Sequence, residues 1–168
     1  MNVLFETGQD GATATTHDWL TPPEILAALG PFDLDPCASE HQPWRTAARQ
    51  LTIRDDGLTQ PWAGRVWCNP PYGPFAARWL ERCAEHGNAV AFVFARTETA
   101  VFQDHVWPKA DAVLFLRGRV SVRLPGGWRT STSNAPNVLI AFGQNNAAGL
   151  RACGIPGAFV GLRNTAEA

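Results

Sequence analysis

The sequence predicts an α/β protein folded as one three-layer sandwich, in which helices cover both faces of a mostly parallel sheet. Over residues 75–142, amphipathic segments with helical spacing alternate with short, almost wholly apolar segments, as in sheets of buried parallel strands. The length of 168 residues and the hydrophobic content of 45% suit a single core. A Gly-rich turn at Gly126–Gly127 predicts that the last two strands form an antiparallel hairpin at the sheet edge.

The first helix and the first strand are expected near the N-terminus. Thr21 can cap a helix over residues 21–29, prolines suit its first turn, and Gly30–Pro31 ends it. Residues 32–35 then alternate apolar and acidic, as in a short strand, and break in a tight turn over 36–39. Because ligands of open α/β sheets bind at the carboxyl ends of strands, this turn is a candidate binding site. Asp33 and Asp35 alone would also fit a solvated strand edge or a weak metal pair.

The remaining elements follow in chain order. Residues 65–68 form an apolar strand, whereas residues 41–50 show little strand pattern. Beyond them we expect helices over 75–84 and 101–106 and strands over 89–95, 112–116 and 136–142.

The chain ends and the cysteines are typical of a cytoplasmic domain. We expect flexible tails over residues 1–17 and 164–168 around one compact domain, residues 18–163. The first 17 residues do not resemble a signal peptide, and no apolar run approaches the ~20 residues of a membrane span. The cysteines have no CxxC spacing and the histidines no paired spacing, so neither disulfides nor a metal site are expected. Cys68 and Cys83 are expected to be buried packing groups.

The loop after the strand at 65–68 carries the clearest chemistry. Its residues are Asn69, Pro70, Pro71 and Tyr72, and the two prolines fix φ and remove two backbone donors. The loop is therefore a rigid row of acceptors, to which Asn69 adds a side-chain oxygen and Tyr72 a flat ring. These groups suit a planar substrate with an exocyclic amine, such as a nucleobase. The alternative is a Pro-rich turn that ends a strand, with Tyr72 as packing.

Arginines later in the chain are candidates for contact with nucleic acid. The net charge of −1 gives no reason to expect a polyanion, but Arg117, Arg119, Arg123 and Arg129 occur without an acid between them. A small, polar run over 130–134 follows, and together they predict a DNA-contacting loop, in which Arg117 and Arg119 would share one face of a strand. Arg96 follows the strand at 89–95 and is placed on the same rim as the Asn-Pro-Pro-Tyr loop. The alternatives are a solvated hairpin for the four arginines and a helix cap at Arg96.

Taken in order, these motifs resemble the phage-type DNA N6-adenine methyltransferase (Dam) family. The resemblance runs from about Asp18 to Phe142 and rests on Thr-Pro-Pro-Glu at 21–24, Leu-Asp-Pro-Cys-Ala at 34–38, Asp-Gly-Leu at 56–58, Trp62 and Asn-Pro-Pro-Tyr at 69–72. It implies a Rossmann-like enzyme that uses S-adenosylmethionine to methylate N6 of an adenine flipped out of double-stranded DNA. The Asn69 oxygen and the Pro70 carbonyl would accept from the amine, and Tyr72 would stack on the base.

The resemblance also implies which residues hold the cofactor. These are Thr21, Pro22, Asp35, Pro36, Cys37, Ala38, Asp56 and Asn69, and Asp55 is the alternative to Asp56. Two departures stand out. Small residues at 37–39 replace the glycines usual in the cofactor turn. The segment between this turn and the catalytic loop is shorter than in a full fold, and no residue is assigned to the cofactor ribose.

Three alternatives to the adenine methyltransferase bear on this resemblance, of which the first and the last remain open. Cytosine N4 is chemically the same kind of amine, so a cytosine N4-methyltransferase is one of them. Protein glutamine N5-methylases share the Asn-Pro-Pro-Tyr loop, but they usually carry a Gly-rich cofactor turn and an extra helical domain. The shortened fold would also suit an inactive nucleic-acid-binding relative, although both the Asp-Pro turn and the catalytic loop are retained. The family is typical of phages and prophages, so we expect expression in a bacterial host cell.

Overall fold

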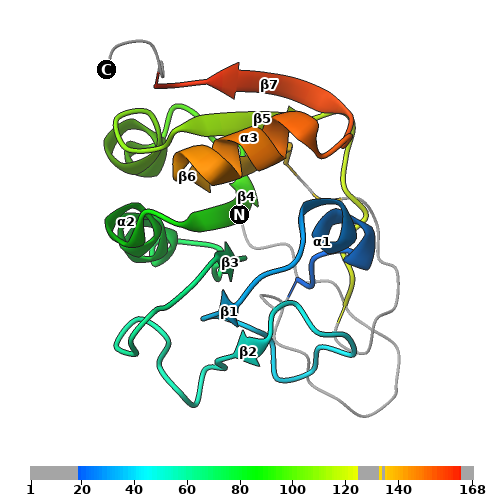
Figure 1. The fold of residues 1–168 in the computed structure, drawn as a ribbon, viewed down its shortest axis with the longest axis vertical. Coiled ribbons are helices and arrows are strands. Elements are labelled where there is room, and N and C mark those ends of the chain that lie inside the picture. The colour runs from blue at the N-terminus through cyan, green and yellow to red at the C-terminus, as the bar shows by residue number, and fades with distance from the viewer. Residues whose placement is uncertain (1–18, 125–132, 134, 164–168) are drawn as a thin grey trace, which may run out of the picture.

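A computed structural model describes residues 19–124, 133 and 135–163 of the chain as one α/β unit (Figure 1). The described strands are β1 (Leu34–Asp35), β2 (Arg49–Gln50), β3 (Val66–Cys68), β4 (Ala89–Phe94), β5 (Ala112–Leu116), β6 (Asn137–Phe142) and β7 (Gly157–Gly161). The described helices are α1 (Pro23–Leu29), α2 (Ala76–His86), the π-helical turn η1 (Phe102–Val106) and α3 (Gln144–Ala152). Among the residues described, no helix is long and apolar enough to cross a membrane. The two predicted tails and the predicted turn at Gly126–Gly127 lie outside the described residues.

The seven strands form one mixed sheet in the order β2-β1-β3-β4-β6-β5-β7. β1 to β4 pair in parallel, as predicted, whereas β6 is antiparallel to both β4 and β5, and β7 is antiparallel to β5. The antiparallel pairing of residues 112–116 with 137–142 is therefore confirmed, but its predicted place at the sheet edge is wrong. β6 lies between β4 and β5, and all six of its residues are buried, as in an interior strand covered on both faces. The sheet is also less parallel than predicted, because half of these pairings are antiparallel.

Two elements after Phe142 are absent from the sequence prediction. α3 begins with Gln144, Asn145 and Asn146, of which the asparagines are weak helix formers, and β7 carries glycine at both ends. Four of the five β7 residues are exposed, so the strand has no apolar alternation and gives little signal in the sequence. β7 forms the sheet edge that the prediction gave to the hairpin.

Helices cover both faces of the sheet, and the strands supply each face with alternate side chains. α2 and η1 pack on one face against Ala89, Ala91 and Val93 of β4. α1 and α3 pack on the other face against Val90 and Phe92. Figure 1 shows α3 lying across β6, with α1 beside it. The α/β architecture with three layers is therefore as predicted, and a sheet that is parallel in its first part and antiparallel later suits a Rossmann-like methyltransferase.

The region between β1 and β3 is reduced, as predicted. Residues 36–65 contain the two-residue strand β2 and no helix. Arg65 compensates by joining distant parts of this layer: its guanidinium donates to the carbonyl oxygens of Leu29 and Gly30 at 2.7 and 3.0 Å and to Asn146 Oδ1 at 2.7 Å. Asp33 accepts from the Arg65 backbone N–H at 2.6 Å. Asp33 is thus a structural residue that connects two strands.

Candidate active site

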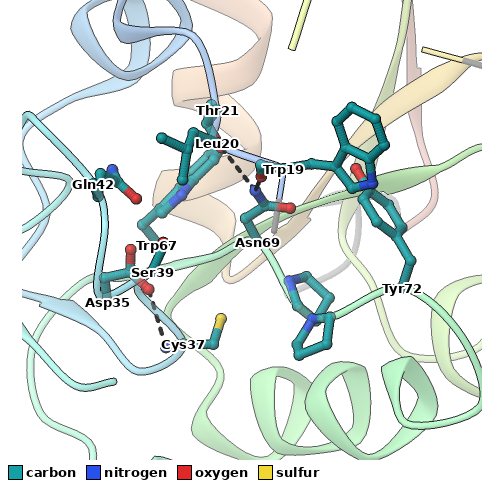
Figure 2. Close-up of a pocket in the computed structure, with 12 residues that line it drawn as sticks. Trp19, Leu20, Thr21, Asp35, Cys37, Ser39, Gln42, Trp67, Asn69 and Tyr72 are labelled. Carbon is teal, nitrogen blue, oxygen red and sulfur yellow. Dashed lines mark hydrogen bonds between the residues drawn. The ribbon is translucent and has the colours of Figure 1, made fainter. Parts of the chain in front are cut away.

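The predicted catalytic residues lie together at the carboxyl ends of the parallel strands. β1 ends at Asp35 and β3 ends just before Asn69, and the loops after both strands line one narrow pocket of about 60 Å³ (Figure 2). Its lining residues are Trp19, Leu20, Thr21, Asp35, Cys37, Ser39, Gln42, Trp67, Asn69, Pro70, Pro71 and Tyr72. The parallel half of the sheet therefore brings the turn of residues 36–39 and the Asn-Pro-Pro-Tyr loop to the same place.

The Asn69 side chain is held in one orientation by two acceptors. Its Nδ2 donates to the backbone oxygen of Trp19 at 2.8 Å and to Thr21 Oγ1 at 3.2 Å. A carbonyl can only accept, so the amide nitrogen must face Trp19. The Asn69 Oδ1 atom is buried and has no hydrogen-bond partner. Figure 2 shows this oxygen pointing away from Thr21, towards the side of the pocket where Tyr72 lies. The site thus presents an unused acceptor in a fixed direction.

The Tyr72 ring is supported from one side. It stacks on Phe94 at the end of β4, with ring centroids 4.2 Å apart and an interplanar angle of 15°. The Tyr72 hydroxyl is buried without a partner, and this burial raises the pKa of Tyr72, so the phenol stays neutral. A stacked pair of this kind forms a rigid aromatic surface beside the catalytic loop.

Asp35 is a buried carboxyl group in the wall of the same pocket. It is 2% exposed and accepts from the Cys37 backbone N–H at 3.1 Å and from the Thr46 hydroxyl. Burial raises the pKa of Asp35 to about 6, although the Thr46 and Cys37 hydrogen bonds act in the opposite direction. A buried carboxylate without a cationic partner is costly, and a cationic ligand would stabilise it.

A wider second pocket of about 340 Å³ adjoins the narrow one, with Cys37, Ser39 and Pro71 in both walls. Its lining residues are Pro36, Cys37, Ala38, Ser39, Glu40, His41, Thr52, Ile53, Asp56, Gly57, Pro71 and Trp79. Asp56 has a φ of 49°, a conformation that aspartate tolerates better than most residues. Gly57 lies so close to Pro36 that a Cβ atom there would be 1.8 Å from the Pro36 oxygen, so the two turns are in direct contact.

Asp55 and Asp56 differ in their surroundings, because only Asp56 lines the second pocket. Asp55 accepts from the backbone N–H and the hydroxyl of Thr52 at 2.8 and 3.1 Å, and these hydrogen bonds lower the pKa of Asp55. Asp55 therefore closes a local turn, whereas Asp56 lines the pocket. Of the two alternatives in the sequence, Asp56 is the one that lines this pocket.

The cysteines pack beneath the turn of residues 36–39. Cys68 and Cys83 are fully buried, as predicted, and the Cys37 sulfur lies 3.7 Å from the Cys68 sulfur. Burial is the main cause that raises the pKa of Cys37 and of Cys68, so both remain thiols. Within the part of the chain that the structure describes, no cluster of His, Cys, Asp or Glu could hold a metal ion.

The predicted DNA-binding arginines lie in different surroundings, although Arg117 and Arg123 line one pocket. Arg96 lines a third pocket, of about 350 Å³, together with Tyr72 and Phe94. Arg117 and Arg119 are exposed and follow the end of β5 at Leu116, with Gly118 between them at a φ of 78°. They are therefore loop residues, and the prediction that they share one face of a strand is wrong.

Arg123 and Pro22 lie near the start of α1 and line a fourth pocket. The Arg123 side chain is 14% exposed and lies 3.5 Å from Glu24 at the start of α1, and its backbone pairs with Leu20. Pro22 lines a fourth pocket with Arg117 and Arg123 and is not among the residues that line the two candidate cofactor pockets. Arg129 lies outside the described residues.

Several lining residues were missed in the sequence. Trp19, Gln42 and Trp67 line the narrow pocket, and Ile53, which is 86% exposed, lines the second. Gln42 lies in the irregular segment between β1 and β2, where no periodicity indicates which side chains face inward. Trp67 could have been found from its position two residues before the catalytic loop, near the carboxyl end of a buried strand.

Comparison with known proteins identifies the family to which the chain belongs. No curated protein and no solved structure matches the chain. The model of one family, DNA N-6-adenine-methyltransferase (Dam), matches residues 10–149, a range that contains both candidate cofactor pockets and the Asn-Pro-Pro-Tyr loop. Methyltransferases of this kind imply S-adenosylmethionine as methyl donor and DNA as substrate. The chain therefore belongs to the Dam family of adenine-specific DNA N6-methyltransferases.

Proposed function

We propose that Asn69, Pro70 and Tyr72 are the groups that carry out methyl transfer to adenine N6 in this protein, on a base flipped out of double-stranded DNA. The observation that carries this proposal is the buried, unpaired Asn69 oxygen, which has a fixed direction beside the Tyr72 ring. A duplex hides the N6 amine within the base stack, so the base has to leave the stack to reach a pocket of this kind.

The acceptors act on the substrate nitrogen. The lone pair of adenine N6 is delocalised into the ring, which makes the amine a poor nucleophile. The Asn69 oxygen and the Pro70 carbonyl would accept its two N–H groups and favour a tetrahedral nitrogen, whose lone pair is free to attack. Positive charge develops on the nitrogen during transfer, and preorganised acceptors stabilise that charge in the transition state more than in the ground state.

The reaction balances without any further reagent. When bound, S-adenosylmethionine would supply the methyl group as an electrophile, and the thioether S-adenosylhomocysteine would remain. The nitrogen lone pair forms the new N–C bond, the electron pair of the broken C–S bond goes to sulfur, and the nitrogen then gives one proton to solvent. The protein's residues orient the amine and stabilise its charge.

The residues present fit the cofactor. In the narrow pocket, the Asp35 carboxyl would pair with the ammonium group of the cofactor's amino-acid end. Gln42 Nε2 and Trp67 Nε1 are buried donors without a partner, and both residues line the same pocket, where they would suit a carboxylate. Asp56 in the adjoining pocket would accept from the cofactor's adenine amine. One zwitterionic end and one adenine end thus have complementary groups in two adjoining spaces.

DNA would be held by exposed charge and by stacking. Arg117 and Arg119 are exposed and are the best placed of the described candidates for phosphate contact. The Tyr72 ring, supported by Phe94, would stack on the flipped base. Arg96 lines the pocket beside this pair and would contact the base or its neighbouring phosphate.

The test is to incubate the protein with unmethylated DNA and labelled cofactor, digest the DNA and identify the modified nucleoside. We expect N6-methyldeoxyadenosine. N4-methyldeoxycytidine would overturn the assignment of the base. If no product formed and calorimetry detected no binding of the cofactor, the protein would be an inactive DNA-binding relative. Single-stranded and duplex substrates are compared in parallel, because a flipping enzyme must accept the duplex.

A further inference from the structure

The hydrogen bonds around Asn69 assign a second role to the segment before α1. By resemblance alone, Thr21 belongs to the cofactor site. In the structure the Thr21 side chain is 1% exposed, and its Oγ1 accepts a hydrogen bond from the Asn69 amide nitrogen, which also donates to the Trp19 carbonyl. Thr21 therefore contacts the catalytic amide directly.

We propose that Thr21 is a positioning residue for methyl transfer, which acts by keeping the Asn69 oxygen turned towards the substrate amine. The inference rests on the proposed role of Asn69. An amide rotated by 180° would present a donor to the N–H groups of the base, so the wrong orientation would repel the substrate it must hold. The Trp19 carbonyl disfavours that rotation, because the rotated oxygen would face it, and the Thr21 hydroxyl adds a second hydrogen bond that holds the amide in its present position.

The segment that carries these acceptors is itself fixed. Leu20 lies between Trp19 and Thr21, and its backbone N–H and oxygen pair with the oxygen and N–H of Arg123 at 2.8 and 3.0 Å. Leu20 is 1% exposed, and α1 begins two residues after Thr21. The acceptors for Asn69 are therefore held by a backbone bridge on one side and by a helix on the other, as a positioning role requires.

The experiment compares Thr21→Val, which keeps the shape and removes the acceptor, with Thr21→Ser, which keeps the acceptor. Single-turnover methylation is measured at saturating cofactor and DNA, and the affinity for S-adenosylhomocysteine is measured by calorimetry. We expect Thr21→Val to lower the single-turnover rate about tenfold, the effect of one hydrogen bond, while Thr21→Ser stays close to the unaltered protein. Thermal unfolding checks that each variant is folded, and Thr21→Ala replaces the valine variant if that one is not.

The outcomes separate this inference from the proposed function. A rate loss that persists at saturating cofactor and is restored by serine supports positioning. A loss that disappears at saturation overturns it and makes Thr21 a cofactor ligand. An equal loss in the serine and valine variants also overturns it, because the acceptor would then be irrelevant. Asn69→Ala is measured in parallel: if that variant keeps its rate, the proposed function fails, whereas a loss confined to Asn69→Ala overturns only the role of Thr21.

Discussion

The polar side chains of the catalytic loop and those of residues 117–119 differ in how firmly the structure holds them. In the loop, the Asn69 amide nitrogen has two acceptors and the Tyr72 ring lies against Phe94. After β5, Arg117 and Arg119 are exposed and have no side-chain partner among the described residues. A group that stabilises a transition state must be fixed in orientation, whereas a group that binds a polyanion needs mainly a charge on a long, exposed side chain. The two regions should therefore respond differently to substitution.

The largest effect is expected at Asn69. Asn69→Ala removes an acceptor that acts mainly in the transition state, so the rate of methyl transfer should fall by about 10²–10³, as when an oxyanion-hole donor is removed. Affinity for S-adenosylhomocysteine should change little, which calorimetry checks on the same preparation. A single-turnover rate within about threefold of the unaltered protein would remove Asn69 from the mechanism.

The next largest effect is expected at Asp35, and it should fall on cofactor binding. Asp35→Ala removes the buried carboxyl that would pair with an ammonium group, and loss of a hydrogen bond to a charged group costs about 1.5–3 kcal/mol, or roughly 10–150-fold in affinity. Binding to duplex DNA should be unchanged, because Asp35 is 2% exposed and lies inside the narrow pocket. Equal losses in calorimetry and in a gel-shift assay would instead make Asp35 a structural residue.

The raised pKa of Asp35 predicts a pH dependence with a definite sign. Because the pKa of Asp35 is about 6 in the folded protein, the carboxyl is protonated below that pH and loses its attraction for an ammonium group. Cofactor affinity should therefore fall as the pH drops through about 6, and binding near that pH should release a proton. Calorimetry at several pH values, in buffers of different ionisation enthalpy, measures both. In Asp35→Asn this pH dependence should vanish.

The same raised pKa has a consequence for folding. The folded state holds the proton of Asp35 more tightly than the unfolded chain, whose value is 3.8, so the free energy of unfolding falls as the pH rises from about 4 to about 6. Above that range the ionised carboxyl costs about 3 kcal/mol. Asp35→Asn should consequently be more stable than the unaltered protein at neutral pH and not at acid pH, as thermal unfolding at the two pH values would show. A cofactor whose ammonium group paired with the Asp35 carboxylate would offset this loss of stability.

A smaller effect is expected at Tyr72. Replacing the ring by alanine should weaken capture of the flipped base by about 1–3 kcal/mol, whereas Tyr72→Phe should be mild because stacking needs only the ring. A fluorescent base analogue at the target position reports capture. If phenylalanine were as damaging as alanine, the buried, unpaired hydroxyl of Tyr72 would be the working group.

Local sequence was sufficient for the elements whose pattern is strong. The strand at 112–116 was predicted at its observed bounds, and the catalytic loop was recognised because two prolines after an apolar strand determine its conformation on their own. The sheet order was not predictable in this way. β6 is placed between β4 and β5 by pairing on both sides, a long-range outcome that no local window contains.

The site shows the same division. The residue types that carry chemistry were found from short motifs, but their partners come from distant parts of the chain. The Asn69–Thr21 hydrogen bond spans 48 positions, and Gln42 lies in a segment without periodicity. The role of Thr21 could not be separated from cofactor binding in the sequence, because both roles need the same residue at the same pocket.

The smallest effects are expected among the arginines, and Arg117 and Arg119 should respond differently from Arg123. If Arg117 or Arg119 binds a phosphate, its replacement by alanine should reduce the slope of log affinity against log salt by about one and weaken target and non-target duplexes alike. Arg123→Ala should leave that slope unchanged and lower the melting temperature, since its side chain is 14% exposed and faces Glu24. Single alanine variants, with Arg129→Ala included, are compared by gel shift over a salt series. A slope change at Arg123 with none at Arg117 and Arg119 would contradict this expectation. The DNA would then contact Arg123, the arginine that is fixed against Glu24 and whose backbone pairs with Leu20 next to Thr21.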